Sequence, residues 1–89
     1  MNQAPIEGSL YIKAFGQAWG VSFVPNTPGV HGSTGVHACE RDEGLMAFLR
    51  ELDVPQERID GALKELRLRG DVSISPIHLT LEQISRYGL

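Results

Sequence analysis

The sequence predicts an α+β domain, in which a small antiparallel sheet is packed on one face by two amphipathic helices. Up to residue 40, apolar residues alternate with period two, which is typical of strands. After Asp42 their spacing changes to i, i+3, i+4 and i+7, which is typical of helices. The predicted order is β-β-β-α-α-β-α. All 89 residues are expected to form one domain, with residues 1–8 as a flexible N-terminal segment.

The first two predicted strands form a hairpin. SLYIKAFG, residues 9–16, alternates so that Tyr11, Lys13 and Phe15 share one face. AWGVSFVP, residues 18–25, brings Trp19 and Phe23 to a common face in the same way. Since only a short turn separates the two runs, they are expected to pair antiparallel.

A third, weaker strand is predicted in STGVHACE, residues 33–40. There Val36 and Ala38 face one way, and His37 and Cys39 face the other. The preceding loop is rich in glycine, but it lacks the Lys-Ser/Thr pair that a phosphate-binding P-loop requires. The loop is therefore interpreted as a connection between strands, with turn geometry supplied by proline, asparagine and glycine.

Two helices follow in tandem. Their apolar positions are Leu45, Phe48, Leu49 and Leu52 in the first helix, and Ile59, Ala62, Leu63 and Leu66 in the second. Pro55 suits the first position of the second helix, and Gly70 suits its C-terminal stop. Each apolar face needs a surface to cover, and the sheet is the available partner.

The last part of the chain predicts a fourth strand and a short helix. DVSISP, residues 71–76, is the strand, and IHLT either continues it past Pro76 or turns back on it. Thr80 and Gln83 have the spacing of a capping box, which predicts a helix over LEQISRYG, residues 81–88.

Composition restricts the function classes. The formal net charge is −3, which argues against a binder of nucleic acid or of anionic membranes. No apolar run approaches the length of a membrane span, and the N-terminal residues do not resemble a secretory signal. A single cysteine excludes an intramolecular disulfide, so a cytoplasmic location is expected.

His37 and Cys39 are the residues whose types most suggest chemistry. They share a strand face, so they could form a small ligand or metal pocket, and His31 and His78 complete a conceivable zinc set. The alternative is a structural thiol beside an ordinary histidine, which the three nearby carboxylates of Glu40, Asp42 and Glu43 favour. We assign no catalytic, cofactor-binding or metal-ligating residue from the sequence, which favours a protein without catalytic activity.

Four aromatic side chains on the hairpin suggest a second alternative. Tyr11, Phe15, Trp19 and Phe23 lie on adjacent strands, where single-stranded nucleic-acid binders place their stacking platforms. Because Lys13 is the one cation in that half of the chain, packing in a core or an interface is the preferred interpretation.

Residues 44–80 offer a third alternative. A helix, a short turn at LDVPQ, a second helix carrying ALKELRLRG and an apolar strand region follow one another, and this order resembles a winged helix-turn-helix. The resemblance implies DNA binding, with residues 55–69 as the recognition helix and residues 71–80 as the wing. Under it, the DNA-facing candidates are Gln56, Arg58, Lys64, Arg67 and Arg69.

The leading interpretation is a small binding module that self-associates or acts as an accessory to a protein partner. It rests on large apolar side chains that fall outside the predicted core faces, because such surfaces often mark interfaces. These candidate interface residues are Tyr11, Phe15, Val24, Met46, Leu68, Leu79 and Leu81. A homo-oligomer is expected, without a cofactor and without a membrane partner.

Overall fold

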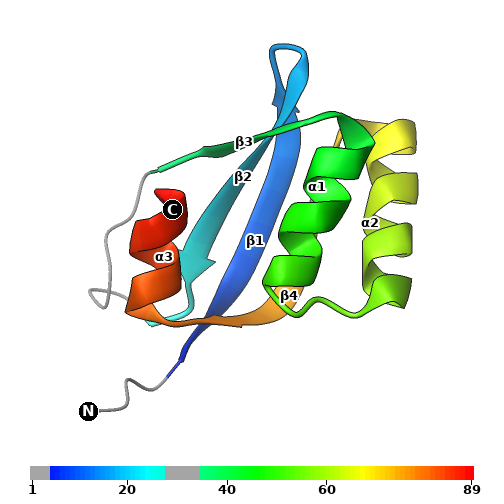
Figure 1. Cartoon of the computed structure of the whole chain (residues 1–89). Helices are drawn as coiled ribbons and strands as arrows, with labels where there is room; N and C mark the ends of the chain where they lie inside the picture. The colour runs from blue at the N-terminus through cyan, green and yellow to red at the C-terminus, as the bar shows by residue number, and fades with distance from the viewer. Residues whose placement is uncertain (1–4, 28–34) are drawn as a thin grey trace.

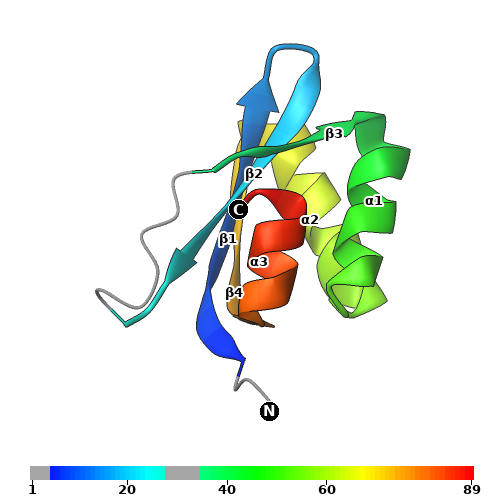
Figure 2. The same cartoon turned by 60° about the vertical axis from the view of Figure 1, so that its left-hand side comes forward.

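Seven elements follow one another in the predicted order. The computed structural model describes residues 5–27 and 35–89. The elements are β1 Ile6–Phe15, β2 Ala18–Pro25, β3 His37–Glu40, α1 Arg41–Glu51, α2 Gln56–Arg69, β4 Asp71–Leu79 and α3 Leu81–Tyr87. The strands form one antiparallel sheet, and the helices lie on one side of it (Figure 1 and Figure 2). The predicted α+β class is confirmed, and α3 joins the two predicted helices on the covered face.

The sheet is built around β1. Its strand order is β3-β2-β1-β4, so the N-terminal strand lies between β2 and the C-terminal strand β4. The β1–β2 register pairs Leu10 with Phe23 and Ile12 with Val21, and all four side chains are buried. Since β1 begins at Ile6, the sheet starts inside the segment 1–8 that was expected to precede it.

β4 continues through Pro76 instead of turning back. The β1–β4 register shifts between Gly8 and Leu10, where the two residues Ser75 and Pro76 lie opposite the single Ser9. This bulge changes the alternation of the strand by one position, so Ile77 and Leu79 face the core. The expectation that Leu79 is exposed is therefore wrong, because Leu79 is fully buried.

The core lies between the sheet and the helices. α1 contributes Leu45, Phe48 and Leu49, and α2 contributes the four residues that its spacing predicts. Gly70 follows α2 with a positive φ of 82°, a conformation that glycine adopts without steric cost, and its N–H donates to the Leu66 carbonyl. The short turn into β4 then lets α2 pack back against the sheet.

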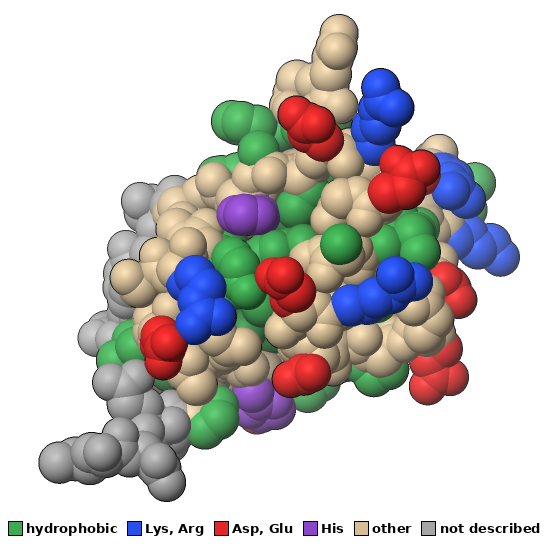
Figure 3. All heavy atoms as spheres, in the orientation of Figure 1, with side chains coloured by type: hydrophobic (Ala, Val, Ile, Leu, Met, Phe, Trp, Pro, Cys, Tyr) green, Lys and Arg blue, Asp and Glu red, His purple; other side chains and the backbone are tan. Residues whose placement is uncertain are grey.

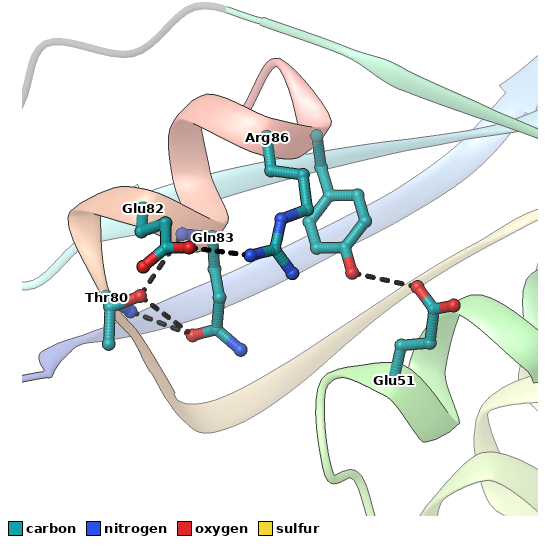
Figure 4. A network of polar contacts seen from close by, with 6 residues as sticks. Glu51, Thr80, Glu82, Gln83 and Arg86 are labelled. Atoms are coloured by element: carbon teal, nitrogen blue, oxygen red, sulfur yellow. Dashed lines mark hydrogen bonds and ion pairs between the residues drawn. The ribbon is translucent and has the colours of Figure 1, made fainter.

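α3 is tied to the domain by polar contacts as well as by its buried Ile84. The Thr80 hydroxyl accepts from the Gln83 backbone N–H at 3.1 Å, and the Gln83 side chain accepts from the Thr80 backbone N–H at 2.9 Å. The predicted capping box is thus confirmed (Figure 4). At the other end of α3, the Tyr87 hydroxyl donates to Glu51 of α1 at 2.8 Å.

Among residues 5–27 and 35–89, no helix is long and apolar enough to cross a membrane. The described residues also place no helix on the second face of the sheet (Figure 2). That second face is called the open sheet face below.

Candidate interaction face

The open sheet face collects the side chains that alternate with the core positions. Its central members are Tyr11, Lys13 and Phe15 on β1, Ala18, Gly20, Ser22 and Val24 on β2, Val36, Ala38 and Glu40 in and beside β3, and Asp71 and Ser73 on β4. The pattern follows directly from strand geometry, because neighbouring residues of a strand point to opposite faces.

Four large apolar side chains of the open sheet face are exposed. Tyr11 is 50% exposed, Phe15 52%, Val24 49% and Val36 43%. Gly20 lies between two of them, since a Cβ atom at Gly20 would stand 3.0 Å from Phe15 Cβ and 3.0 Å from Val36 Cγ1. The absence of a side chain at Gly20 therefore lets Phe15 and Val36 close over the backbone of β2 and form one continuous apolar surface.

Two shallow hollows shape the open sheet face. The first, of about 490 Å³, is lined by Tyr11, Lys13, Ser22, Val24 and Val36 together with residues 71–73 of β4. The second, also of about 490 Å³, is lined by Phe15, Gln17, Ala18, Ala38, Glu40 and Arg41. Protruding aromatic rings and hollows thus occur side by side on the same surface.

One charge of the open sheet face lies within its apolar surface, since Lys13 is between Tyr11 and Phe15 on the central strand β1. In the strand register, Lys13 lies opposite Gly20 of β2 and opposite Asp71 of β4. Glu40 lines the second hollow beside Phe15. Among the described residues, neither Lys13, Glu40 nor Asp71 forms an ion pair. These side chains are therefore available to a charged group from outside the chain.

The predicted interface residues divide between several surfaces. Tyr11, Phe15 and Val24 come together on the open sheet face. Leu68 is 73% exposed on α2, Leu81 is exposed on α3, and Met46 of α1 is half-buried against the core. Val36 joins this surface although it is not among the predicted interface residues. Its alternation with His37 and Cys39 already places it on the face of β3 that lies away from Cys39.

The aromatic platform suggested by the sequence is divided between the two faces of the sheet. Tyr11 and Phe15 lie on the open sheet face, whereas Phe23 is buried under the helices. Trp19 is half-buried on the covered side, where its indole N–H donates to Asp42 at 3.1 Å. A base could therefore reach two of the four rings.

Cys39 lies in the core instead of at a surface. The residue is 5% exposed, and burial raises the pKa of its thiol to about 11. A thiolate is the nucleophilic and metal-binding form, so this environment disfavours both kinds of chemistry at neutral pH.

His37 lies on the covered face of the sheet in an aromatic cluster. Its ring stacks on Phe48 with the ring centroids 4.2 Å apart, and the Tyr87 ring meets it edge-on at 5.7 Å. Its Nδ1 atom is 3.1 Å from the Tyr87 carbonyl oxygen. Because a carbonyl can only accept, Nδ1 carries the proton, and His37 acts as a link between β3 and α3.

The described residues hold no group of three or more His, Cys, Asp or Glu side chains that could bind a metal ion. His78, a member of the conceivable zinc set, lies 3.2 Å from Glu7 on the sheet. His31 and the glycines Gly29 and Gly32 of the loop lie outside the described residues.

The candidate DNA-facing residues are largely engaged within the domain. Gln56 accepts from Arg50 and donates to Asp60, and Arg58 donates to the carbonyl oxygens of Ser75 and Pro76. Arg67 pairs with Asp42, and Arg69 pairs with Glu65. Cations and anions are interspersed over the helical side of the molecule, as Figure 3 shows.

The strand region that the winged-helix resemblance assigned to a wing has a different role. Residues 71–79 form the single strand β4, which pairs with β1 along its length. The expectation of a wing over residues 71–80 is therefore wrong. The N-terminal strand provides the pairing partner that residues 44–80 alone lack.

Comparison with known proteins does not extend these observations, since no family model, no curated protein and no solved structure matches the chain.

Proposed function

We propose that this chain is a protein-interaction module without catalytic activity, and that the open sheet face is its binding surface. The observation that carries the proposal is the gathering of Tyr11, Phe15, Val24 and Val36 on the sheet face that no described helix covers. Exposed apolar patches of this kind, surrounded by polar residues, mark interaction surfaces in soluble proteins.

The chemistry of the surface supports a protein partner. Its exposed large side chains are apolar and aromatic, and such residues are enriched in protein interfaces. Lys13 lies among them on β1, and Glu40 and Asp71 lie on the outer strands β3 and β4. In contrast, a nucleic-acid platform needs several cations around its aromatic rings. Lys13 and Arg41 are balanced by Glu40 and Asp71 around the two hollows, so the open sheet face has no excess of cations to attract phosphate.

The proposal keeps the expected cytoplasmic location. A single buried cysteine requires no oxidising compartment, and a reducing compartment would leave Cys39 as the free thiol of the structure.

Site-specific photo-crosslinking in cells that produce the protein tests this function. A photoreactive phenylalanine analogue replaces Phe15 in one variant and Leu68 in the matched control, because Leu68 is an exposed apolar residue on α2. We expect position 15 to give a discrete protein adduct, identified by mass spectrometry, that position 68 does not give. Introducing Val36→Asp beside the photoreactive group should abolish that adduct.

Equal labelling from both positions would contradict a specific surface. Adducts that contain nucleic acid and no protein would contradict a protein partner. A second copy of this chain and a different protein are both accepted as the partner in this experiment.

A further inference from the structure

We infer that the partner on the open sheet face is a second copy of this chain, packed face to face about a two-fold axis that runs parallel to the strands between β1 and β2. The inference rests on the proposed function and specifies its partner. Three features of the open sheet face support it: the sizes of the facing side chains, the arrangement of charge, and the available area.

Side-chain size differs between the two central strands. On the open sheet face, the register sets Tyr11 beside Ser22, Lys13 beside Gly20 and Phe15 beside Ala18. β1 therefore carries a row of large side chains, and β2 carries small residues at the same levels. Phe15 and Val36 cover Gly20, so the low places on β2 are at Ser22 and Ala18, where the two hollows lie. A row of large side chains needs a low row opposite it if two sheets are to pack closely.

A two-fold axis parallel to the strands supplies this match. The axis keeps each residue at its level along the strands and exchanges β1 with β2, so the large row of one copy lies over the small row of the other. Tyr11 then meets the level of Ser22, where the first hollow lies. The contact is isologous, because the same patch is used on both copies.

The alternative axis, which crosses the strands, is less favourable. That axis would place β1 of one copy over β1 of the second copy, with the two strands running in opposite directions. Lys13 is midway between Tyr11 and Phe15, so an axis through the centre of the aromatic row would bring the two Lys13 side chains together. Like charges in direct opposition are destabilising, and two large rows would hold the sheets apart.

The parallel axis also places Lys13 between two carboxylates, because Asp71 lies opposite it in the same sheet and Glu40 of the second copy lies near it across the interface. Lys13 of one copy would lie at the level of Ala38 of the second copy, and Glu40 of that copy is two residues further along β3. With sheets about 10 Å apart and strands about 4.8 Å apart, the two Cα atoms would be separated by about 13 Å, which extended lysine and glutamate side chains together can span. Symmetry produces this contact twice.

The area is sufficient for a dimer of modest affinity. The four strands together contain 31 residues. At about 3.4 Å along a strand and about 4.8 Å between strands, one sheet face measures about 500 Å² per copy and at most about 1,000 Å² in total, which is at the lower limit of specific interfaces. We therefore expect a reversible dimer with a dissociation constant in the micromolar range.

Charge reversal provides the test. In sedimentation equilibrium of the purified protein, Lys13→Glu and Glu40→Lys should each raise the dimer dissociation constant by about tenfold or more, because each variant opposes like charges twice. An equimolar mixture of the two variants should form a heterodimer with an affinity close to that of the wild type. In that mixture both contacts again join a lysine to a glutamate.

The mixture shows whether the two charges act between copies. A loss of affinity caused by a change inside one chain would persist in the mixture, whereas repulsion between copies would be relieved. Glu40 is the N-cap residue of α1, so Glu40→Gln serves as a milder second variant, and thermal unfolding of each variant verifies the fold. Leu68→Ser on α2 is the control outside the interface, and it should leave the dissociation constant unchanged.

A wild-type protein that remains monomeric at high micromolar concentration would overturn the inference. So would a dimer that is insensitive to both charge reversals, or a mixture that fails to associate. If the purified chain is monomeric and photo-crosslinking still finds another protein at position 15, the proposed function stands and the second copy is rejected. If neither association is found, both proposals fail.

Discussion

At the scale of single residues, Asp42 joins three elements. One carboxylate oxygen accepts from the Trp19 indole N–H of β2, and the other pairs with Arg67 of α2 at 2.9 Å. Asp42 itself is in the first turn of α1, where a negative charge is favourable. Hydrogen bonds from Arg67 and then from Trp19 lower the pKa of Asp42 below its ordinary value.

This lowered pKa predicts a pH dependence of stability. The ionised Asp42 stabilises the folded state at every pH above the ordinary aspartate pKa, and this contribution is lost as the pH falls through the lower pKa of the folded state. The difference in unfolding free energy between the wild type and Asp42→Asn should therefore be largest near neutral pH and should shrink below about pH 4.

Urea denaturation followed by the fluorescence of Trp19, the one tryptophan of the chain, measures this difference. Asp60→Asn is the matched control, because Asp60 is exposed on α2 and its side chain accepts a hydrogen bond from Gln56 of the same helix. An Asp42→Asn variant with the same pH profile as the wild type would contradict the assigned role.

Cys39 gives a second prediction at the residue scale. Its buried thiol, with a pKa of about 11, should react far more slowly than free cysteine with a small disulfide reagent at neutral pH. The reaction should reach the rate of free cysteine once denaturant unfolds the domain. A rate above that of free cysteine in the folded protein would instead identify Cys39 as a reactive centre.

The raised pKa of Cys39 also predicts that the unfolding free energy decreases at alkaline pH. The unfolded chain releases the proton near the ordinary cysteine pKa of about 8.5, whereas the folded chain holds it until about pH 11. The protonated thiol therefore contributes its full stabilisation of the folded state below about pH 8.5, and this stabilisation is lost as the pH rises towards 11. Comparison with Cys39→Ala isolates this effect from the titration of lysine and tyrosine.

At the scale of elements, α3 depends on its capping box. Thr80→Ala removes the acceptor for the Gln83 backbone N–H and should lower the unfolding free energy by about 1 kcal/mol. Chemical denaturation measures the change. Ser85→Ala, an exposed substitution in the same helix, should have little effect, and equal losses in both variants would show that the cap is not responsible.

The element boundaries show what periodicity can and cannot predict. The spacing of Leu45, Phe48 and Leu49 predicts the buried face of α1, because a helix repeats its geometry residue by residue. The alternation of β4 fails after Ile74, because the bulge at Ser75 and Pro76 exchanges the two faces of the strand. A bulge depends on the pairing partner, which a local pattern does not contain.

The candidate interaction surface was predictable to a similar extent. Alternation along β1 separates Tyr11 and Phe15 from the core, and the structure places both on the open sheet face. The sequence could not show that Val36 joins them over Gly20, because that contact depends on the pairing of β2 with β3 and on the chain direction after the loop. Leu68 and Leu81 satisfy the same sequence criterion but lie on separate helices.

At the scale of the whole molecule, charge is balanced instead of concentrated. Arg67 and Arg69 are paired with acids, and both signs of charge are interspersed over the helical side (Figure 3). We therefore predict that the protein does not bind a labelled DNA duplex or single strand in fluorescence anisotropy, even at low salt. Nucleic-acid affinity arises mainly from unpaired cations that neutralise phosphates.

Binding that weakens steeply with salt and is abolished by the double substitution Lys64→Glu and Arg67→Glu would contradict this prediction. It would restore the α2 surface as a nucleic-acid site in spite of the missing wing.

The contact between Arg58 and β4 limits edge pairing with another copy. At Ser75 and Pro76 the outer edge of β4 has its carbonyl groups occupied by Arg58, and Pro76 has no N–H to donate. A further strand therefore cannot extend the sheet continuously on this side. Growth of a filament by edge pairing needs two open edges on each copy. In the described part of the chain, the unblocked stretches are the four residues of β3 and residues 71–74 of β4. A strand that another copy adds at either edge would therefore pair with a few residues of this sheet and not with a whole strand.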